Sequence, residues 1–280
     1  MTTKIAVVAN LSLQVFQQHA LRTLTASPSQ QLRGHSPSSS IGNSPITNFG
    51  ALEQLLKKIT SPSSHVKNNT SSGHDHLFED NLRRLITTLK NLTSHDVGLD
   101  LRWISDTTSY AAPVVYIHIM ENEVFSMGIF VLRPGSRIPL HDHPGMFGIL
   151  RVLYGSLRCR SFTRLDGERA IYPGSPLASA LSPLTTSASS RWQLTDLVVV
   201  QPHQDTILSV DSDPCLLTPS EGNLHELTVC DEAAVFLDIL APPYDHDLGT
   251  RECRFYREVI LPQPVLISSA AGDSSTTTSI

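Results

Sequence analysis

Two histidines separated by a single residue, His141 and His143, stand in a stretch that can bind a metal. Successive side chains of a β-strand point to opposite faces, so both imidazoles project together if this stretch is the end of a strand. Neutral imidazole is a good ligand for iron, zinc, copper and nickel. The pair therefore predicts part of a metal site, and a further ligand has to come from elsewhere in the fold.

The best candidate for the third ligand is His225. It follows a turn-forming stretch that ends at Gly222, and it leads into the apolar run Leu227 to Val229. This pattern is typical of a turn that enters a strand. A second His-x-His pair, His74 and His76, borders a polar stretch without a strand pattern, and we interpret it as solvent-exposed histidines.

The elements that would position these histidines are short and β-prone. Turn residues such as Pro134-Gly135, Gly155 and Pro242-Pro243 separate them. Many short strands with frequent turns indicate an all-β sandwich or barrel. The predicted strands are Val114 to Ile119, Val124 to Leu132, Ile149 to Leu153, Leu157 to Phe162, Leu197 to Gln201, Leu224 to Val229 and Ala234 to Leu240.

The preceding residues have helical spacing and polar linkers. Apolar residues predict helices over 5–24, 52–59 (with Asn48 as its cap) and 77–92, and the Ser-rich stretches 27–45 and 61–73 predict linkers. We therefore divide the chain into N-terminal helices with Ser/Pro-rich linkers (1–76), a β-rich domain (77–265) and a disordered tail (266–280). The stretch 175–190 is expected to be a surface loop.

Composition restricts the function further. Of 280 residues, 40% are hydrophobic and the net charge is −5, which argues against a nucleic-acid-binding protein. No apolar run reaches the length of a membrane-spanning helix, and no secretory signal is evident at the N-terminus. We expect a cytoplasmic protein, with the nucleus as the alternative. The four cysteines form no Cys-x-x-Cys pair, so they predict free thiols rather than a structural zinc site.

Two spacings make the sequence similar to a known fold family. The run from Gly135 through His141 and His143 resembles the first cupin motif, and the spacing of Gly222 and His225 resembles the second. Cupins usually have a glutamate where this chain has Gly148. More specifically, the chain resembles the cysteamine (2-aminoethanethiol) dioxygenase and plant cysteine oxidase family from about 77 to 262, with insertions around 175–190 and 204–213. The likeness is carried by Arg137 to Met146, Val152 to Gly155, Leu237 to Asp245 and Arg251 to Arg257.

The resemblance implies a cupin fold, which is a double-stranded β-helix or jelly-roll barrel. It also implies an iron(II) enzyme that uses O2 to oxidise cysteamine, or the N-terminal cysteine of a protein, to a sulfinic acid. In this family such oxidation marks regulatory proteins for oxygen-dependent degradation. The expected partners are the thiol substrate and O2, with no nucleic acid and no membrane, and the expected state is a monomer.

The resemblance also implies roles for four further residues. Asp238 matches the family's pocket aspartate, which can pair with the substrate ammonium, and Tyr244 can shape the pocket mouth. An ordinary strand-end carboxylate and a packing tyrosine are the alternatives. Cys253 and Tyr256 lie where the family carries a Cys-x-Tyr-Tyr run, in which the Cys can cross-link to the Tyr two residues on. Phe255 stands at that position here, so either the cross-link is dispensable or Tyr256 has another role.

The missing glutamate has a chemical consequence. Three neutral histidines leave the metal's positive charge uncompensated, so a substrate thiol can bind as the thiolate. Three protein ligands also leave positions for substrate and O2. Two rivals remain open: a three-histidine zinc site that activates water for hydrolysis, and a non-catalytic cupin that binds a ligand or partner.

Overall fold

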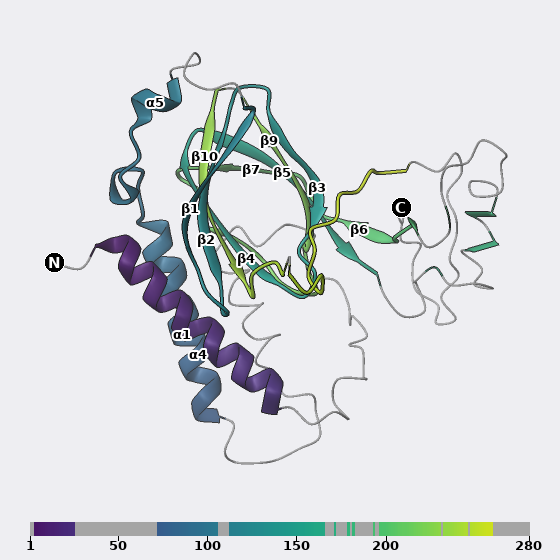
Figure 1. Ribbon diagram of the computed structural model, residues 1–280, viewed down its shortest axis with the longest axis horizontal. Helices are drawn as coiled ribbons and strands as arrows, with labels where there is room; N and C mark the ends of the chain where they lie inside the picture. The colour runs from purple at the N-terminus through teal and green to yellow at the C-terminus, as the bar shows by residue number, and fades with distance from the viewer. Residues whose placement is uncertain are drawn as a thin grey trace.

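The computed structural model describes residues 3–25, 72–105, 112–165, 171, 178–179, 181–182, 193, 196–230, 232–245 and 247–259 (Figure 1). Its helical elements are α1 (Lys4–Thr25), α4 (Ser72–Lys90), the 3-10 helix η1 (His95–Val97) and α5 (Leu101–Ser105). Its strands are β1 (Val114–Glu121), β2 (Ser126–Leu132), β3 (Arg137–Asp142), β4 (Phe147–Tyr154), β5 (Ser156–Arg164), β6 (Val200–Pro202), β7 (Thr206–Ser209), β8 (Cys215–Leu217), β9 (Leu224–Val229) and β10 (Ala234–Ala241).

The strands form two antiparallel sheets that enclose a common interior. Sheet A has the order β1-β2-β10-β4-β8, and sheet B has the order β3-β9-β5-β6 with β7 also paired to β5. Consecutive strands repeatedly cross from one sheet to the other, as a double-stranded β-helix requires. No ladder among the described strands joins the two sheets. The expected all-β cupin fold is therefore confirmed, as two facing sheets rather than a closed barrel.

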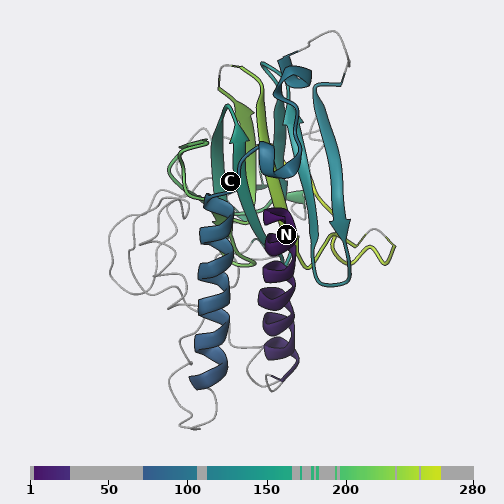
Figure 2. The same ribbon diagram turned by 90° about the vertical axis from the view of Figure 1, so that its left-hand side faces the viewer.

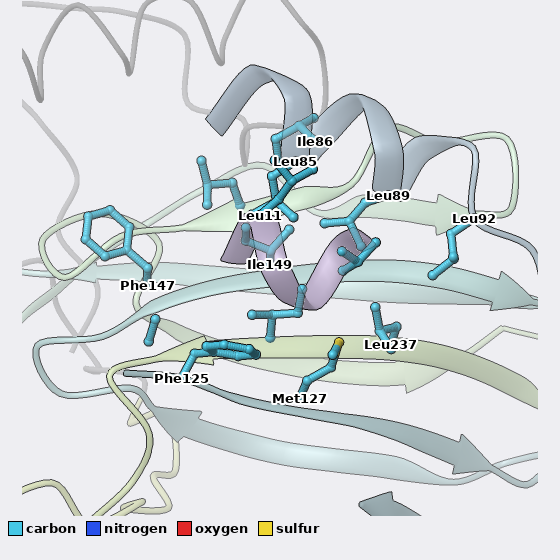
Figure 3. Packing of buried hydrophobic residues seen from close by; sticks show 14 of the residues in the cluster. Leu11, Leu85, Ile86, Leu89, Leu92, Phe125, Met127, Phe147, Ile149 and Leu237 are labelled. Atoms are coloured by element: carbon cyan, nitrogen blue, oxygen red, sulfur yellow. The ribbon is translucent and has the colours of Figure 1, made fainter. Parts of the chain in front are cut away.

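Helices α1 and α4 lie side by side against the outer face of sheet A (Figures 1 and 2). Residues on alternate positions of β2 and β10 point toward these helices, because side chains of a strand alternate between its faces. Figure 3 shows Leu11 and Leu85 above the sheet and Ile149 and Leu237 below them in one apolar layer. This layer fixes sheet A as a rigid wall behind the interior.

The interior between the sheets is apolar over much of its length. Residues from both sheets are buried there in a second cluster, which contains Leu132, Leu150, Val152, Leu157, Cys159, Leu208, Cys215, Leu227, Val229, Ala234 and Phe236. The apolar packing holds the two sheets at a fixed separation. It therefore positions side chains that face the interior beyond the cluster.

The predicted elements agree with the structure in most places. The helix expected over 5–24 spans Lys4–Thr25, and the helix expected over 77–92 already begins at Ser72, so His74 and His76 fall in a helix. The stretch 204–213, which we expected to be an insertion relative to the family, contains β7, which pairs with β5. The predicted helix 52–59, the linker 27–45 and the tail 266–280 lie outside the described residues, as does most of 175–190. The domain boundaries stay a prediction.

None of the described helices combines the length and the apolar character that crossing a membrane requires.

Candidate metal centre

Three imidazoles converge at one end of the interior. His141 on β3 and His225 on β9 are direct partners in the ladder of sheet B, so both side chains stand on the same face. His143 follows β3 immediately. The Nε2 atom of His225 lies 3.2 Å from Nε2 of His141 and 3.1 Å from Nε2 of His143. The structure therefore brings together all three histidines that the sequence singled out, and all three are buried.

Asn223 holds the loop that carries His143. The Asn223 side-chain amide donates to the carbonyl oxygens of His143 (2.6 Å) and Thr218 (3.0 Å), while the backbone N–H of His143 donates to the Asn223 carbonyl (3.2 Å). These bonds tie the turn after β3 to the turn before β9. Sequence reasoning missed Asn223, and its position two residues before His225 was the only available signal.

Hydrogen bonds to the Nδ1 atoms set the orientation of two rings. Nδ1 of His141 lies 2.8 Å from the Pro139 carbonyl oxygen, so this nitrogen carries the proton. The Tyr244 hydroxyl donates to the Asp142 carbonyl (2.7 Å) and lies 2.8 Å from Nδ1 of His143, which therefore donates to the hydroxyl. Both Nε2 atoms consequently present a lone pair to the centre, as metal-bound histidines do.

All three imidazoles are neutral in this environment. Burial lowers the pKa of His143 to about 3, with a further contribution from the neighbouring His141. Burial likewise lowers the pKa of His141 and holds the pKa of His225 well below its usual value. Neutral imidazole is the form that binds a metal. The site therefore needs no proton loss from its histidines near neutral pH.

The carboxylate of Asp142, the residue between His141 and His143, faces away from the centre. The Asp142 carboxylate accepts hydrogen bonds from the Arg254 backbone N–H (2.9 Å) and the Tyr256 hydroxyl (2.7 Å). Tyr256 in turn donates its backbone N–H to the Leu140 carbonyl (2.8 Å). Asp142 therefore fastens the C-terminal segment onto the edge of β3. The role of the Tyr256 hydroxyl in the fold is therefore its hydrogen bond to Asp142. Burial together with this hydrogen bond raises the pKa of Tyr256 to about 12.

The position where cupins usually carry a carboxylate is crowded by a neighbouring apolar side chain. A Cβ atom added to Gly148 would lie 2.8 Å from a methyl carbon of Leu217 on the adjacent strand β8. Leu217 is buried and closes this volume with an apolar side chain. Among the described residues, the only group able to hold a metal consists of the three histidines.

The donor set fits a single metal ion. Imidazole nitrogens bind zinc at about 2.0–2.1 Å, so two ligands of one ion must lie farther apart than one bond and closer than two. The separations of 3.1 and 3.2 Å meet this condition. An all-imidazole set suits iron, zinc, copper and nickel. The geometry is therefore suited to a divalent transition-metal ion, whose positive charge these neutral ligands would not compensate.

Asp238 lies on the inner face of sheet A. In the ladders its partners are Gly128 on β2 and Leu150 on β4. Burial raises the pKa of its carboxyl to about 7. Its charge also raises the pKa values of Tyr116 and Tyr244, so it lies within electrostatic range of both. Because Tyr244 contacts His143, Asp238 belongs to the surroundings of the same centre.

Cys253 and Phe255 lie on the C-terminal segment beside the site. The Cys253 thiol is a hydrogen-bonding partner of the Tyr244 hydroxyl, and burial raises its pKa. Phe255 is 65% exposed, and its ring centroid lies 6.1 Å from that of His141. The structure therefore places Tyr244, Cys253 and Tyr256 around the loop that holds His141 and His143.

Comparison with known proteins agrees with this geometry. A family model described as PCO_ADO matches residues 88–278. The chain is 37% identical over 209 residues to a 2-aminoethanethiol dioxygenase of Homo sapiens, covering 70% of this chain and 72% of the relative. It is 35% identical over 241 residues to a 2-aminoethanethiol dioxygenase of Mus musculus, covering 82% and 87%.

A more distant relative is a plant cysteine oxidase. Plant cysteine oxidase 1 of Arabidopsis thaliana is 29% identical over 187 residues, covering 64% of this chain and 56% of the relative. The matched residues 88–278 include all ten strands and the three converging histidines. The chain belongs to the PCO_ADO family of thiol dioxygenases.

Proposed function

We propose that this protein is an iron(II)-dependent thiol dioxygenase that converts an aminothiol and O2 into a sulfinic acid. The observation that carries the proposal is the convergence of three neutral imidazoles with no carboxylate among them. The substrate class follows from the relatives, which are named for 2-aminoethanethiol and cysteine. The reaction is balanced as thiol plus O2 gives sulfinic acid, with the sulfur oxidised and both oxygen atoms retained.

In this proposal His141, His143 and His225 hold the metal. Iron(II), when bound, supplies the chemistry that joins both atoms of O2 to the thiol sulfur. The protein contributes a site whose positive charge is not compensated by a carboxylate, and this favours the thiolate form of the substrate. Leu217 is buried and packs where a side chain at position 148 would lie, so this part of the interior is apolar.

Asp238 is the proposed partner of the substrate ammonium. Without substrate, burial keeps the pKa of this carboxyl near 7. An ammonium group close to it favours the carboxylate and lowers that pKa. The charge pair would orient the aminothiol with its sulfur toward the histidines. Both cysteamine and a peptide with an N-terminal cysteine carry an ammonium on the carbon next to the thiol-bearing one, so both fit.

The proposal includes a reducing compartment, the cytoplasm or the nucleus, and a monomeric state. All four cysteines are free thiols, which is usual in reducing compartments. Among the described residues, exposed large hydrophobic side chains are few, as expected for a monomer. Light scattering of the purified protein measures its oligomeric state, and a dimer would contradict the proposed monomer.

The direct test combines metal analysis with oxygen uptake. Protein purified without chelators and loaded anaerobically with iron(II) is mixed with cysteamine or with an N-terminal-Cys peptide. We expect one iron per chain, thiol-dependent O2 uptake and a product heavier by two oxygen atoms. His95→Ala, which changes an exposed histidine on η1, is the matched control and should behave like the unmodified protein.

Two outcomes would replace the proposal by its rivals. Stoichiometric zinc with hydrolytic activity and no O2 uptake would indicate a zinc hydrolase. Full iron loading without any turnover of either thiol would indicate a cupin that only binds a ligand or partner.

A further inference from the structure

One buried hydroxyl beside the three histidines makes no hydrogen bond to any residue that the structure describes. Ser161 on β5 is 4% exposed, and its Oγ atom has no hydrogen-bond partner among the residues that the structure describes. A buried hydroxyl without a partner costs free energy, and most such groups in native proteins have one. The Ser161 side chain therefore calls for a partner from outside the described chain.

The ladder of sheet B places this hydroxyl next to the metal centre. His225 is the direct partner of His141 on one side and of Ser161 on the other. Directly paired residues of an antiparallel sheet project from the same face. The three side chains therefore form one row on the inner face, and Ser161 lies on the side of His225 that is remote from His141.

The two neighbours of Ser161 on the same face of β5 have partners for their polar side-chain atoms. The Thr163 hydroxyl accepts a hydrogen bond from the Gly222 backbone N–H (2.9 Å) and lies 2.7 Å from Nε2 of His203. Cys159, two residues in the other direction, contacts the thiol of Cys215 across the interior. Both are thus satisfied within the fold, whereas Ser161, between them, is not.

The backbone of Ser161 is held by hydrogen bonds, which fix the direction of its Cα–Cβ bond. Its carbonyl accepts a hydrogen bond from the His203 backbone N–H (2.9 Å), in addition to the pairing of β5 with β9. The Ser161 Cβ atom is therefore held in the row beside His225, and the hydroxyl that it carries is buried. A buried hydroxyl in this position can donate a hydrogen bond to a ligand bound at the three histidines.

We propose that Ser161 is a substrate-binding residue whose hydroxyl donates a hydrogen bond to the thiolate sulfur held at the three histidines. This inference rests on the proposed function. A thiolate is the strongest acceptor that the substrate offers, and a bond to a charged acceptor best offsets the cost of burying the hydroxyl. Ser161 would then hold the sulfur on the side of the site opposite His141.

The test uses Ser161→Ala in the full-length, iron(II)-loaded protein under argon, where no turnover occurs. Titration with cysteamine should give a dissociation constant about tenfold higher than that of the unmodified protein, because one charge-assisted hydrogen bond is lost. The iron content should be unchanged. The thiol-free protein should unfold at the same temperature or a higher one, since the removed hydroxyl had no partner among the described residues.

Ser12→Ala is the matched control. Ser12 is also buried, with 0% exposure, but its hydroxyl donates to the Val8 carbonyl within α1 (2.9 Å). This variant should leave the cysteamine dissociation constant unchanged, because Ser12 lies in α1, outside the site. The two serines should therefore differ in cysteamine binding.

Three results would overturn the inference. An unchanged dissociation constant in Ser161→Ala would remove the hydroxyl from thiolate binding, while the proposed function stands. A clear drop in unfolding temperature would show that the hydroxyl serves the fold. If the unmodified iron-loaded protein binds no cysteamine, the proposed function fails, and the inference fails with it.

Discussion

The two halves of the interior are built on the same strands but serve different ends. Along the inner face of β9, Val229 and Leu227 belong to the apolar cluster, and the next inward residue is His225. Along β5, Leu157 and Cys159 are followed in the same way by Ser161. One half is thus packed to hold the sheets together, and the other presents polar groups to a ligand.

The inner face of sheet A shows the same change from apolar to polar residues. On the inner face of β10, Ala234 and Phe236 are apolar and Asp238 follows them. The comparison teaches that period-two alternation decides which face a residue occupies, whereas the change from apolar to polar along that face marks the site. The apolar half fixes the sheet separation, and this in turn fixes the distances between the histidines and the groups of sheet A.

Removing a ligand in the polar half should have the largest effect. In His225→Ala we expect metal affinity to fall by about 100-fold or more, since loss of a partner of a metal ligand already costs 10–100-fold. Thiol oxidation should fall with it. Metal analysis after dialysis and O2 uptake measure both, and normal turnover in this variant would remove His225 from the ligand set.

The matching substitution in the apolar half should affect stability instead. Leu227→Ala, two residues along the same strand, removes a fully buried side chain and should lower the free energy of unfolding by about 2–5 kcal/mol. The folded fraction should still bind one metal per chain. Denaturant unfolding and metal analysis separate the two effects, and loss of metal from folded protein would contradict the division into halves.

Asp238 should make the stability of the metal-free protein depend on pH. Its pKa is raised to about 7 in the folded state, so the folded state binds this proton more tightly than the unfolded state does. The stabilisation is complete below about pH 4 and is lost as the pH rises through 7, by roughly 4 kcal/mol in total.

Asp238→Asn isolates this contribution. The free energy of unfolding of the variant, measured by denaturant titration from pH 4 to 7, should decline less steeply than that of the unmodified protein. Equal slopes in the two proteins would show that the carboxyl is not desolvated. The experiment is made without metal, because a bound cation would itself lower this pKa.

The smallest effect is expected at the contact that orients His143. Tyr244→Phe removes the hydroxyl that bridges Nδ1 of His143 and the Asp142 carbonyl. We expect a loss of about tenfold in metal affinity, at the lower end of the range for partners of metal ligands. Competition with a metal chelator measures it, and an unchanged affinity would mean that packing alone orients the ring.

The sequence was sufficient to predict the facing strands and the convergence of His141, His143 and His225. Alternation along a strand is local, and each histidine motif is a short run next to a turn, so short-range patterns carried the information. The short strand β7 was taken for part of an insertion, because four residues are too few to show a period. Its pairing with β5 depends on tertiary contacts.

The supporting contacts could not be predicted from the sequence. The bond between Asp142 and Tyr256 joins residues 114 positions apart, and Asn223 holds a loop 80 positions away. Ser161 has the same limitation, because a single serine in a strand acquires meaning only when its ladder partner is known to be His225. Such contacts follow from the packing of the two sheets.

The central claim is that the three-histidine centre delivers both atoms of one O2 molecule to a thiol sulfur. It is tested most directly by incubating the iron-loaded enzyme with cysteamine under ¹⁸O2 and determining the mass of the product by mass spectrometry. The account predicts a sulfinic acid in which both oxygen atoms carry the label. A product with one labelled oxygen, or with none, would contradict it.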